Sequence, residues 1–330
     1  MKDNRWKIVT IGGGSGQFAL LFGLRDIDGV DITAIVSMVD SGGSTGRLRD
    51  ELGILPPGDV LKCVLALSPH RDIVRAILLK RFSGDGRLQG HNAGNMLLTM
   101  LAEYTGNFPT GVKALAEILD AQGTILPVTV DKATLVAELN DGSRIYGQSA
   151  IDIPRDTQRE RIKDIYLVPH HHDSISAYPP VIEAINSADY IIIGPGDLYT
   201  SIVPNLIVPG VKEAFRETKA TVLYVINIMT KFGETHNFGG FDFVRKVEEY
   251  IGRSVDGIIY NVTRPNHKIL KQYQKHKAEF VEIDDYGEVW GNRAIYTSDL
   301  MSTAGGIIRH DSKKLSLLIS KIIFSRKAAS

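Results

Sequence analysis

Cysteine is almost absent from this chain, and neither sign of charge dominates it. The 330 residues include one cysteine, Cys63, which excludes an intramolecular disulfide and is typical of a reducing compartment. Because Cys63 lies in the apolar run 60–67, a buried structural thiol is favoured over a nucleophile. Lys plus Arg and Asp plus Glu both total 38, so no global charge attracts nucleic acid or an anionic membrane, although a local basic patch stays open.

Long hydrophobic runs are also missing. Apolar runs such as 190–194 are far shorter than the approximately 20 residues that a membrane-spanning helix needs. The polar segment 1–7 lacks the pattern of a secretory signal. With 43% hydrophobic and 23% charged residues, the composition suits a compact protein. We therefore expect a cytoplasmic protein without a membrane span, folded as one domain over residues 1–330.

A glycine-rich turn follows the first predicted strand. The run 7–11 is rich in β-forming residues, Gly12 to Gly16 follow it, and apolar residues at helical spacing come next. Such a turn exposes a helix N-terminus, which favours a phosphate. The glycine spacing matches neither the dinucleotide fingerprint nor a P-loop. Tight packing of the strand on the helix is the alternative interpretation.

The segment 36–59 contains a second polar turn. An apolar run, 32–39, ends at Asp40, and small residues and two arginines follow at 41–49. Backbone N–H groups and hydroxyls of such a turn can contact an anion, and Asp40 could hold a metal ion or a sugar hydroxyl. An ordinary flexible loop is the alternative. Two glycine-rich turns at the carboxyl ends of neighbouring strands favour a ligand site in an open α/β sheet.

Three further strand or helix boundaries show the same design. Asn92 and Asn95 precede a predicted helix, where they could cap it or bind a base or phosphate. A buried strand, 188–194, ends in Gly-Pro-Gly-Asp, and the strand 221–226 ends at Asn227. Strands and helices alternate, and polar residues gather at strand ends. This pattern predicts an α/β fold with a doubly wound, mostly parallel sheet and one ligand cleft.

Residues 124–168 show a different sequence pattern. Short strands over 125–130, 133–139 and 144–146, with a hairpin turn at 140–143, predict a small β-rich excursion packed beside the main sheet. Its charge run, Arg155, Arg159, Arg161 and Lys163, is most simply a solvated face. The run His170–Asp173 invites a metal site, but adjacent residues point in different directions and no Cys or Glu stands at ligand spacing.

Helix boundaries near the C-terminus suggest two further roles. Arg309 precedes the last predicted helix, 312–324, where it could clamp a diphosphate or pair with a surface carboxylate. Ser312 could be phosphorylated, but helix capping explains it better.

Taken together, the motifs resemble those of the bacterial gluconeogenesis factor family, the YvcK-like proteins, over nearly the whole chain and in the same order. That family is similar in fold to the 2-phospho-L-lactate transferases, the CofD-like proteins. The motifs that carry the resemblance are Gly12–Gly16, Asp40–Arg49, Pro56–Asp59, Gly90–Asn95, Gly194–Ser201, Pro204–Asn205, Asn227–Thr230, Gly233–Thr235 and Arg309–Asp311.

The resemblance implies a Rossmann-like, CofD-like fold that holds a nucleotide diphosphate. For the gluconeogenesis factors it implies UDP-N-acetylglucosamine as the ligand and a role in cell shape and wall metabolism on gluconeogenic carbon sources. It further implies that Asp40 helps to hold a divalent metal ion such as Mg²⁺ and the acceptor. Asp197 stands where many relatives are expected to have serine, and its charge beside a diphosphate requires a metal ion or a ribose hydroxyl.

Combined with the strand-end pattern, the resemblance yields a set of candidate residues. Gly12 to Gly14, Ser44 and Thr45 are expected to face the diphosphate, Tyr273 to stack on the base and Arg309 to clamp phosphate. Asp40 and Asp197 are the candidate metal ligands, and Asp40 is the candidate catalytic residue if the protein is a transferase. The predicted ligand-binding residues are Gly12, Gly13, Gly14, Asp40, Ser41, Gly43, Ser44, Thr45, Asn92, Asn95, Gly194, Gly196, Asp197, Thr200, Asn227, Tyr273 and Arg309.

Two functions follow. A nucleotide-sugar-binding regulatory protein without turnover is favoured, since no complete set of nucleophile, base and orienting group is visible in the sequence. The alternative is a metal-dependent transferase that acts at the diphosphate. Nicotinamide-dependent redox chemistry is disfavoured by the glycine spacing. We expect a homo-oligomer, protein partners in cell-wall regulation and no nucleic-acid partner.

Overall fold

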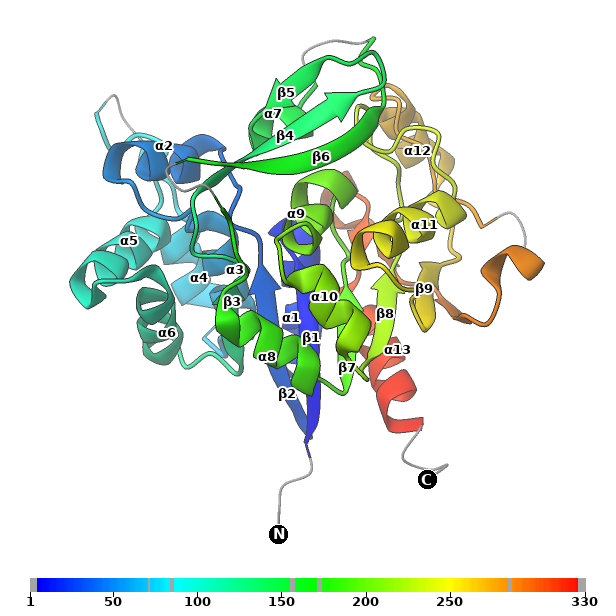
Figure 1. Cartoon of the computed structure of the whole chain (residues 1–330), viewed down its shortest axis with the longest axis horizontal. Helices are drawn as coiled ribbons and strands as arrows, with labels where there is room; N and C mark the ends of the chain where they lie inside the picture. Colours follow the sequence, from blue (N-terminus) through cyan, green and yellow to red (C-terminus); the bar gives the residue numbers. More distant parts are fainter. Residues whose placement is uncertain are drawn as a thin grey trace.

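A parallel sheet of seven strands forms the centre of the described part of the chain (Figure 1). The computed structural model describes residues 5–70, 72–83, 86–154, 158–170, 174–283 and 287–325. Every neighbouring pair of strands in this sheet is parallel. From edge to edge the strands are β10 (Ala294–Ser298), β9 (Gly257–Asn261), β8 (Thr221–Val225), β7 (Tyr190–Ile193), β1 (Trp6–Gly12), β2 (Val30–Val36) and β3 (Thr124–Pro127).

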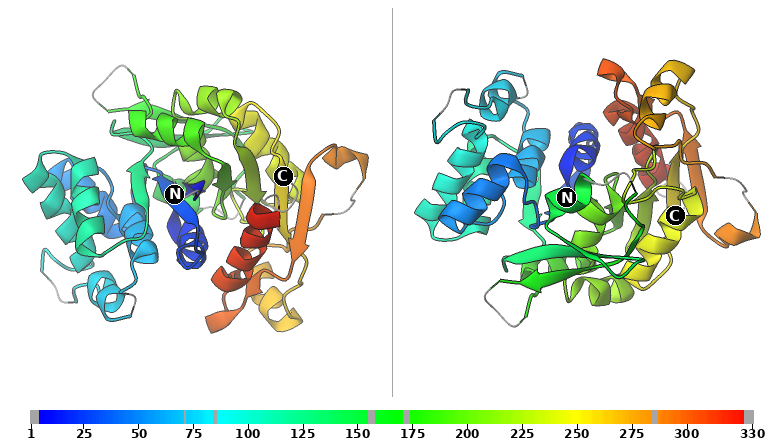
Figure 2. Two further views of the ribbon diagram at one scale, coloured as in Figure 1. Left: turned by 90° about the horizontal axis from the view of Figure 1, so that it is seen from below. Right: turned by 90° about the horizontal axis from the view of Figure 1, so that it is seen from above.

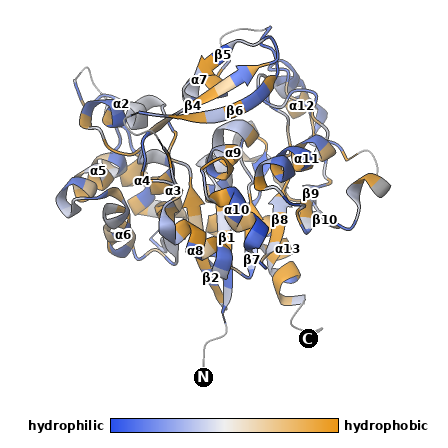
Figure 3. Cartoon of the chain, in the orientation of Figure 1, coloured by the Kyte–Doolittle hydropathy of each residue, from blue (hydrophilic) through white to orange (hydrophobic). Residues whose placement is uncertain are grey.

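Both faces of the sheet are covered, which explains its apolar strands. All residues of β7 and β9 are buried, as expected for parallel strands between two layers of helices. The hydropathy colouring in Figure 3 shows this apolar centre. The helices are α1 (Gly14–Leu24), α2 (Gly43–Leu52), α3 (Gly58–Leu67), α4 (Asp72–Leu79), α5 (Ala93–Thr105), α6 (Phe108–Ile118), α7 (Gln148–Asp152), α8 (Pro179–Ser187), α9 (Val203–Leu206), α10 (Val211–Glu217), α11 (Gly240–Ile251), α12 (His267–Gln274) and α13 (Ser312–Ser325).

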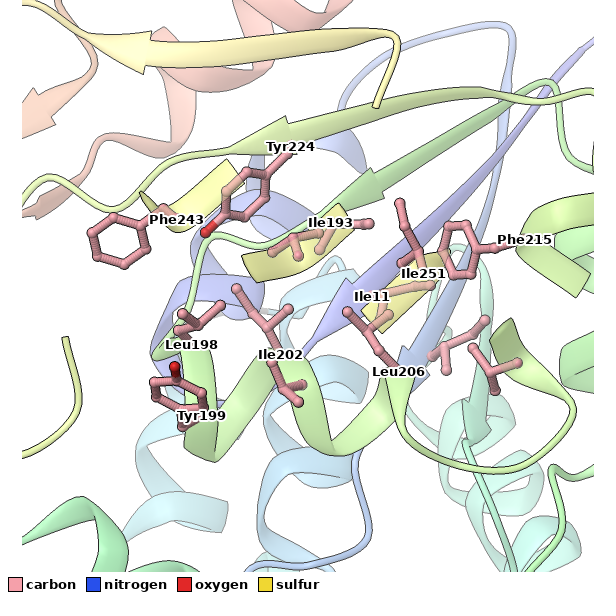
Figure 4. Close-up of a cluster of buried hydrophobic side chains, with 14 of the residues drawn as sticks. Ile11, Ile193, Leu198, Tyr199, Ile202, Leu206, Phe215, Tyr224, Phe243 and Ile251 are labelled. Carbon is pink, nitrogen blue, oxygen red and sulfur yellow. The ribbon is translucent and has the colours of Figure 1, made fainter. Parts of the chain in front are cut away.

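Two apolar clusters correspond to the two faces. One contains Leu20 of α1, Leu61 of α3 and Ile319 of α13, and α1 packs against both other helices. The other contains Phe215 of α10 and Phe243 of α11 and continues through η1 (Leu198–Ile202), a π-helical turn before α9 (Figure 4). Figure 2 shows α2 to α6 together on one side of α1, with α12 and the segment before α13 on the other.

A small antiparallel sheet lies beyond the carboxyl ends of the main strands (Figure 1). It contains β5 (Arg144–Tyr146), β4 (Ala133–Leu139) and β6 (Ile162–Pro169), and the turn 140–143 joins β4 to β5 as predicted. The excursion begins at β4 and not at about 124, because β3 pairs in parallel with β2 at the edge of the main sheet. Two short strands, β11 (Met301–Ser302) and β12 (Arg309–His310), pair near the C-terminus, and 3₁₀ turns form η2 (Glu288–Trp290) and η3 (Ala304–Gly306).

The sequence predicted the alternation of strands and helices correctly but missed some elements. Neither η1 nor β10 was predicted. The predicted N-cap of α13, Ser312, is wrong, because Ser312 lies inside the helix. Asp311 caps the helix by accepting hydrogen bonds from the N–H groups of Lys313 and Lys314. Arg155 and the run 171–173 lie outside the described residues. No helix of the described part is long and apolar enough to cross a membrane.

Candidate functional site

The candidate site lies where the order of the sheet reverses. The chain passes from β1 through α1 to β2 on one side, whereas β7 starts the series that continues to β8 on the other. In open α/β sheets, ligands bind at the carboxyl ends of the strands at such a switch point. The loops Gly12–Gly16 and Gly194–Asp197 follow β1 and β7 and therefore meet there.

The first loop packs so closely against the second loop and against α3 that side chains are excluded from it. A Cβ atom on Gly16 would lie 2.2 Å from the carbonyl oxygen of Pro195, and one on Gly13 would lie 2.8 Å from Oδ2 of Asp59. Glycine is therefore required at position 16 for packing. Tight packing was the alternative interpretation of this turn. The turn also leaves the N-terminus of α1 without a side-chain cap, so its first N–H groups can still contact an anion.

A cavity of about 850 Å³ opens at this switch point. Its walls come from six segments of the chain that are far apart in the sequence. They are Gly13–Gly16, Asp152–Pro154, Pro195–Asp197, Asn227–Phe232, Gln272–Ala278 and Gly306–His310, with Ala19 and Ser201. Of the predicted ligand-binding residues, those that line the cavity are Gly13, Gly14, Gly196, Asp197, Asn227, Tyr273 and Arg309.

Three predicted residues lie just behind the cavity wall. The carbonyl oxygen of Gly12 accepts a hydrogen bond from Asn205 Nδ2 at 3.1 Å, and the N–H of Gly194 donates to Ile11. The hydroxyl of Thr200 is buried and donates to Glu234 Oε1 at 3.2 Å. These residues support the loops and do not line the cavity.

The predicted hydroxyl and amide residues 44, 45, 92 and 95 form a separate buried group. Ser44 Oγ lies 2.9 Å from Nδ1 of His91, and Asn95 Nδ2 donates to the hydroxyls of Ser44 and Thr45 at 3.4 and 3.5 Å. Asn92 caps α5, as predicted, by accepting from the N–H of Asn95 at 2.7 Å. Since they bond one another and do not line the cavity, direct contact of Ser44 and Thr45 with a diphosphate stays a prediction.

Asp40 lies in a carboxylate pair that borders the glycine turn. The N–H of Gly42 donates to Asp40 Oδ1 at 2.9 Å. Burial, and then the negative charge of Asp59, raise the pKa of Asp40 above its usual value. Lys62 Nζ lies 2.8 Å from Asp59 Oδ1 and offsets part of this charge. Pro57 is the N-cap of α3, and Asp59 lies in the first turn of that helix.

The remaining residues of the turn after β2 hold it in place. Ser41 Oγ accepts a hydrogen bond from the N–H of Ser149 in α7 at 3.1 Å and so links the turn to the β-rich excursion. Gly43 begins α2 with a positive φ of 47°, a backbone conformation that favours glycine.

The sequence did not predict the ion cluster around Lys231 on the cavity wall. Lys231 Nζ contacts Asp152, lies 2.7 Å from Asp197 Oδ2 and lies 3.0 Å from Glu234 Oε1. Oxygens of the three carboxylates are within 4.8 Å of one another, a spacing suited to a metal ion. The ammonium group already supplies the counter-charge, so a metal ion at Asp197 would have to displace it.

Glu234 is the most deeply buried member of this cluster. Its side chain is 1% exposed, and it accepts hydrogen bonds from the N–H of Tyr199 and from Thr200. Burial raises the pKa of Glu234 to about 7, although Lys231 acts in the opposite direction. The folded chain therefore favours the protonated form of this carboxyl group more than an unfolded chain does.

Aromatic and cationic residues also line the cavity. The hydroxyl of Tyr273 accepts a hydrogen bond from the N–H of Ile308 at 2.8 Å and fixes the loop before β12. Phe232, which the sequence did not single out, also lines the cavity, with Lys277 Nζ 4.5 Å from its ring centroid. Burial lowers the pKa of His310 to about 4, so this ring is neutral at pH 7. Arg309 is exposed, and β12 packs against α1.

A doubly wound α/β fold with a cavity at its switch point, beside an uncapped helix N-terminus, defines the class of Rossmann-like proteins. Within this class the chain belongs to the CofD family, because the family model described as 2-phospho-L-lactate transferase CofD matches residues 8–301.

Proteins of known name agree with this assignment. The chain is 39% identical to a candidate gluconeogenesis factor of Thermotoga maritima, covering 96% of this chain and 99% of that protein. It is 36% identical to the gluconeogenesis factor of Bacillus subtilis, covering 96% and 98%. A crystal structure of a UPF0052 family protein from Bacillus halodurans superimposes with a TM-score of 0.88 at 34% identity, covering 96% and 99% of the two chains. The predicted fold and family resemblance are confirmed.

Proposed function

We propose that the switch-point cavity binds a nucleotide diphosphate sugar of the UDP-N-acetylglucosamine type, and that the protein responds to this ligand without consuming it. The cavity itself carries the proposal. Its volume of about 850 Å³ lies in the range of small-molecule sites, which is about 300–1,000 Å³. The N-terminus of a helix, an arginine and aromatic residues lie around one cavity. Together they supply the contacts that phosphates and a base require.

The charge distribution supports a particular orientation. Asp152 and Asp197 share the ammonium of Lys231, and Lys275, Lys277 and Arg309 also line the cavity. We infer that the diphosphate lies between the N-terminus of α1 and Arg309. The base then has Phe232 as a stacking surface in addition to Tyr273, whose hydroxyl is already engaged.

Calorimetry separates the ligand classes. UDP-N-acetylglucosamine, GDP and NAD are each titrated into the full chain, with and without Mg²⁺. We expect saturable heat with UDP-N-acetylglucosamine, weaker or no heat with GDP, and none with NAD. Binding of NAD alone would contradict the proposal and indicate a dinucleotide site.

A second function is supported by the Asp40 and Asp59 pair. Burial and the charge of Asp59 raise the pKa of Asp40, and in their ionised form the two carboxylates would hold a divalent cation such as Mg²⁺. When bound, the cation would stabilise charge that develops on the leaving phosphate. In the transferase reaction an acceptor hydroxyl oxygen attacks the phosphorus that bears the transferred group. The bond from that phosphorus to the bridging oxygen breaks, the nucleoside monophosphate leaves, and the hydroxyl proton passes to Asp40.

Asp40→Asn tests this alternative. A transferase should lose at least about a hundredfold in turnover of labelled nucleotide, because the amide cannot accept the proton, while ligand affinity changes little. Asp50→Asn, an exposed change in α2, is the matched control. Absence of released nucleotide from the unmodified protein over a wide range of acceptors would leave the regulatory proposal alone.

In the cell, we propose a cytoplasmic gluconeogenesis factor that couples nucleotide-sugar supply to wall metabolism and cell shape. The names of the Bacillus subtilis and Thermotoga maritima relatives support the gluconeogenic part. Expression of this chain in a Bacillus subtilis strain that lacks its gluconeogenesis factor should restore growth and rod shape on a gluconeogenic carbon source. Light scattering tests the proposed homo-oligomer.

A further inference from the structure

Basic residues are concentrated in one segment of a chain that is otherwise balanced in charge. Residues 264–277 contain five of the 38 Lys and Arg residues, two histidines, and no Asp or Glu. All five basic side chains are exposed, and the segment includes α12, which buries none of its residues. Figure 1 shows α12 near the β-rich excursion, beyond the carboxyl ends of the main strands.

Three of the cations form a stripe on one side of the helix. Lys268, Lys271 and Lys275 follow one another at spacings of three and four residues, so they share a face and extend over about 10 Å. We call these three residues the lysine stripe. The half-buried apolar residues Ile269 and Tyr273 lie on the opposite side. The bond from Ile308 to the hydroxyl of Tyr273 fixes that side to the loop before β12.

Neither ion pairs nor the helix dipole explains the position of the lysine stripe. Arg264, outside the helix, forms an ion pair with Glu282, but within the described residues no carboxylate oxygen lies within 4.0 Å of the three stripe ammonium groups. Interaction with the helix dipole favours cations in the last turn only. Lys268 lies in the first turn, where a cation is unfavourable.

We propose that the lysine stripe is a docking surface for an acidic segment of a partner protein. Three ammonium groups spread over about 10 Å cannot converge on one small anion, but they match carboxylates spaced along a polypeptide. The apolar side of α12 faces the protein, so the helix does not present the apolar face that insertion into a membrane requires. The aromatic residue of α12, Tyr273, lies on the side opposite the lysines and bonds the loop before β12, so the stripe itself offers no ring for stacking on nucleic-acid bases.

The lysine stripe reaches the edge of the cavity. Lys275 belongs both to the lysine stripe and to the cavity lining, together with its neighbours Gln272 and His276. A partner on the stripe therefore lies at the edge of the cavity and can respond to its contents. The docking surface itself does not depend on which ligand the cavity binds.

The test measures binding of a fluorescein-labelled poly-L-glutamate peptide to the full chain by fluorescence anisotropy. Lys268→Glu/Lys271→Glu reverses two stripe charges that do not line the cavity. The control is Lys113→Glu/Lys219→Glu, which makes the same change in net charge at two exposed positions elsewhere. We expect salt-sensitive binding that falls about tenfold in the stripe variant and less than about twofold in the control.

Calorimetry with UDP-N-acetylglucosamine accompanies the peptide titration, so that failure of the docking surface is distinguished from failure of the cavity proposal. Vesicles of phosphatidylcholine and phosphatidylglycerol and a single-stranded oligothymidylate replace the peptide in parallel assays. Equal losses in the stripe and control variants, or no peptide binding, would overturn the proposal. Tighter stripe-dependent binding of vesicles or oligonucleotide would overturn the assignment to an acidic protein segment.

Discussion

At the scale of single residues, Glu234 is the group whose chemistry depends most on folding. Its carboxyl is buried, its hydrogen-bond donors come from η1, and its cation is three residues away. The sequence places Glu234 in a recognised motif but gives it no role, because its contacts with Tyr199 and Thr200 cross 34 residues or more. Periodicity identifies local structure and cannot identify such contacts.

Glu234 should make stability depend on pH. Its pKa is about 7 in the folded chain and about 4.3 in an unfolded one, so between these values the folded state binds more protons. The contribution to stability is full below the unfolded pKa and is lost as pH rises through 7. Denaturant unfolding should therefore show that Glu234→Gln reduces the fall in stability between pH 5 and 8.

The control for this prediction is Glu217→Gln, an exposed change at the end of α10. It should leave the pH dependence of unfolding unchanged. Parallel pH profiles for Glu234→Gln and the unmodified protein would show that the carboxyl of Glu234 titrates normally.

At the scale of elements, the loops after β1 and β7 are the parts that the sequence predicted best. Both were expected at strand ends in one cleft, and Gly13, Gly196 and Asp197 line the same cavity. The turn after β2 was expected there too, and the hydroxyls of Ser44 and Thr45, at the start of α2, bond Asn95 of α5. Pattern alone shows that a polar turn follows a strand, whereas the direction of its side chains depends on how α2, α3 and α5 pack.

Gly16→Ala tests the contact between the two loops. Alanine should favour the helix by about 1 kcal/mol, since Gly16 lies in α1 with ordinary helical φ. The new Cβ atom would lie 2.2 Å from the carbonyl oxygen of Pro195, and this clash should outweigh the gain, giving a net loss of about 2 kcal/mol or more in urea unfolding.

Gly86→Ala is the matched change at a site with no atom within 4 Å of the new Cβ. It should alter stability by less than about 0.5 kcal/mol. A Gly16→Ala variant as stable as the Gly86→Ala variant would contradict the proposed tight contact of the loops.

At the scale of the whole molecule, alternation of strands and helices was enough to predict the doubly wound sheet. The order of strands was not available from the pattern, and β3 and β10 were misassigned or missed because edge strands are short and only partly apolar. The position of the cavity-lining residues of α12 and β12 also depends on tertiary packing. Arg309 and Tyr273 were expected at the site on family resemblance and do line the cavity.

Arg309→Met tests whether this cavity-lining arginine binds a phosphate group. Loss of a charge-assisted contact to phosphate should weaken the affinity for a nucleotide diphosphate sugar by about tenfold or more. Arg245→Met, which changes an exposed arginine of α11 outside the cavity lining, should leave the affinity within about twofold.

The most direct test of the central claim is calorimetric titration of the full chain with UDP-N-acetylglucosamine, using the unmodified protein and these two arginine variants. We expect saturable binding that Arg309→Met weakens and Arg245→Met preserves. Absence of heat with every uridine nucleotide, or equal affinity of the Arg309→Met and unmodified proteins, would contradict a diphosphate site in this cavity.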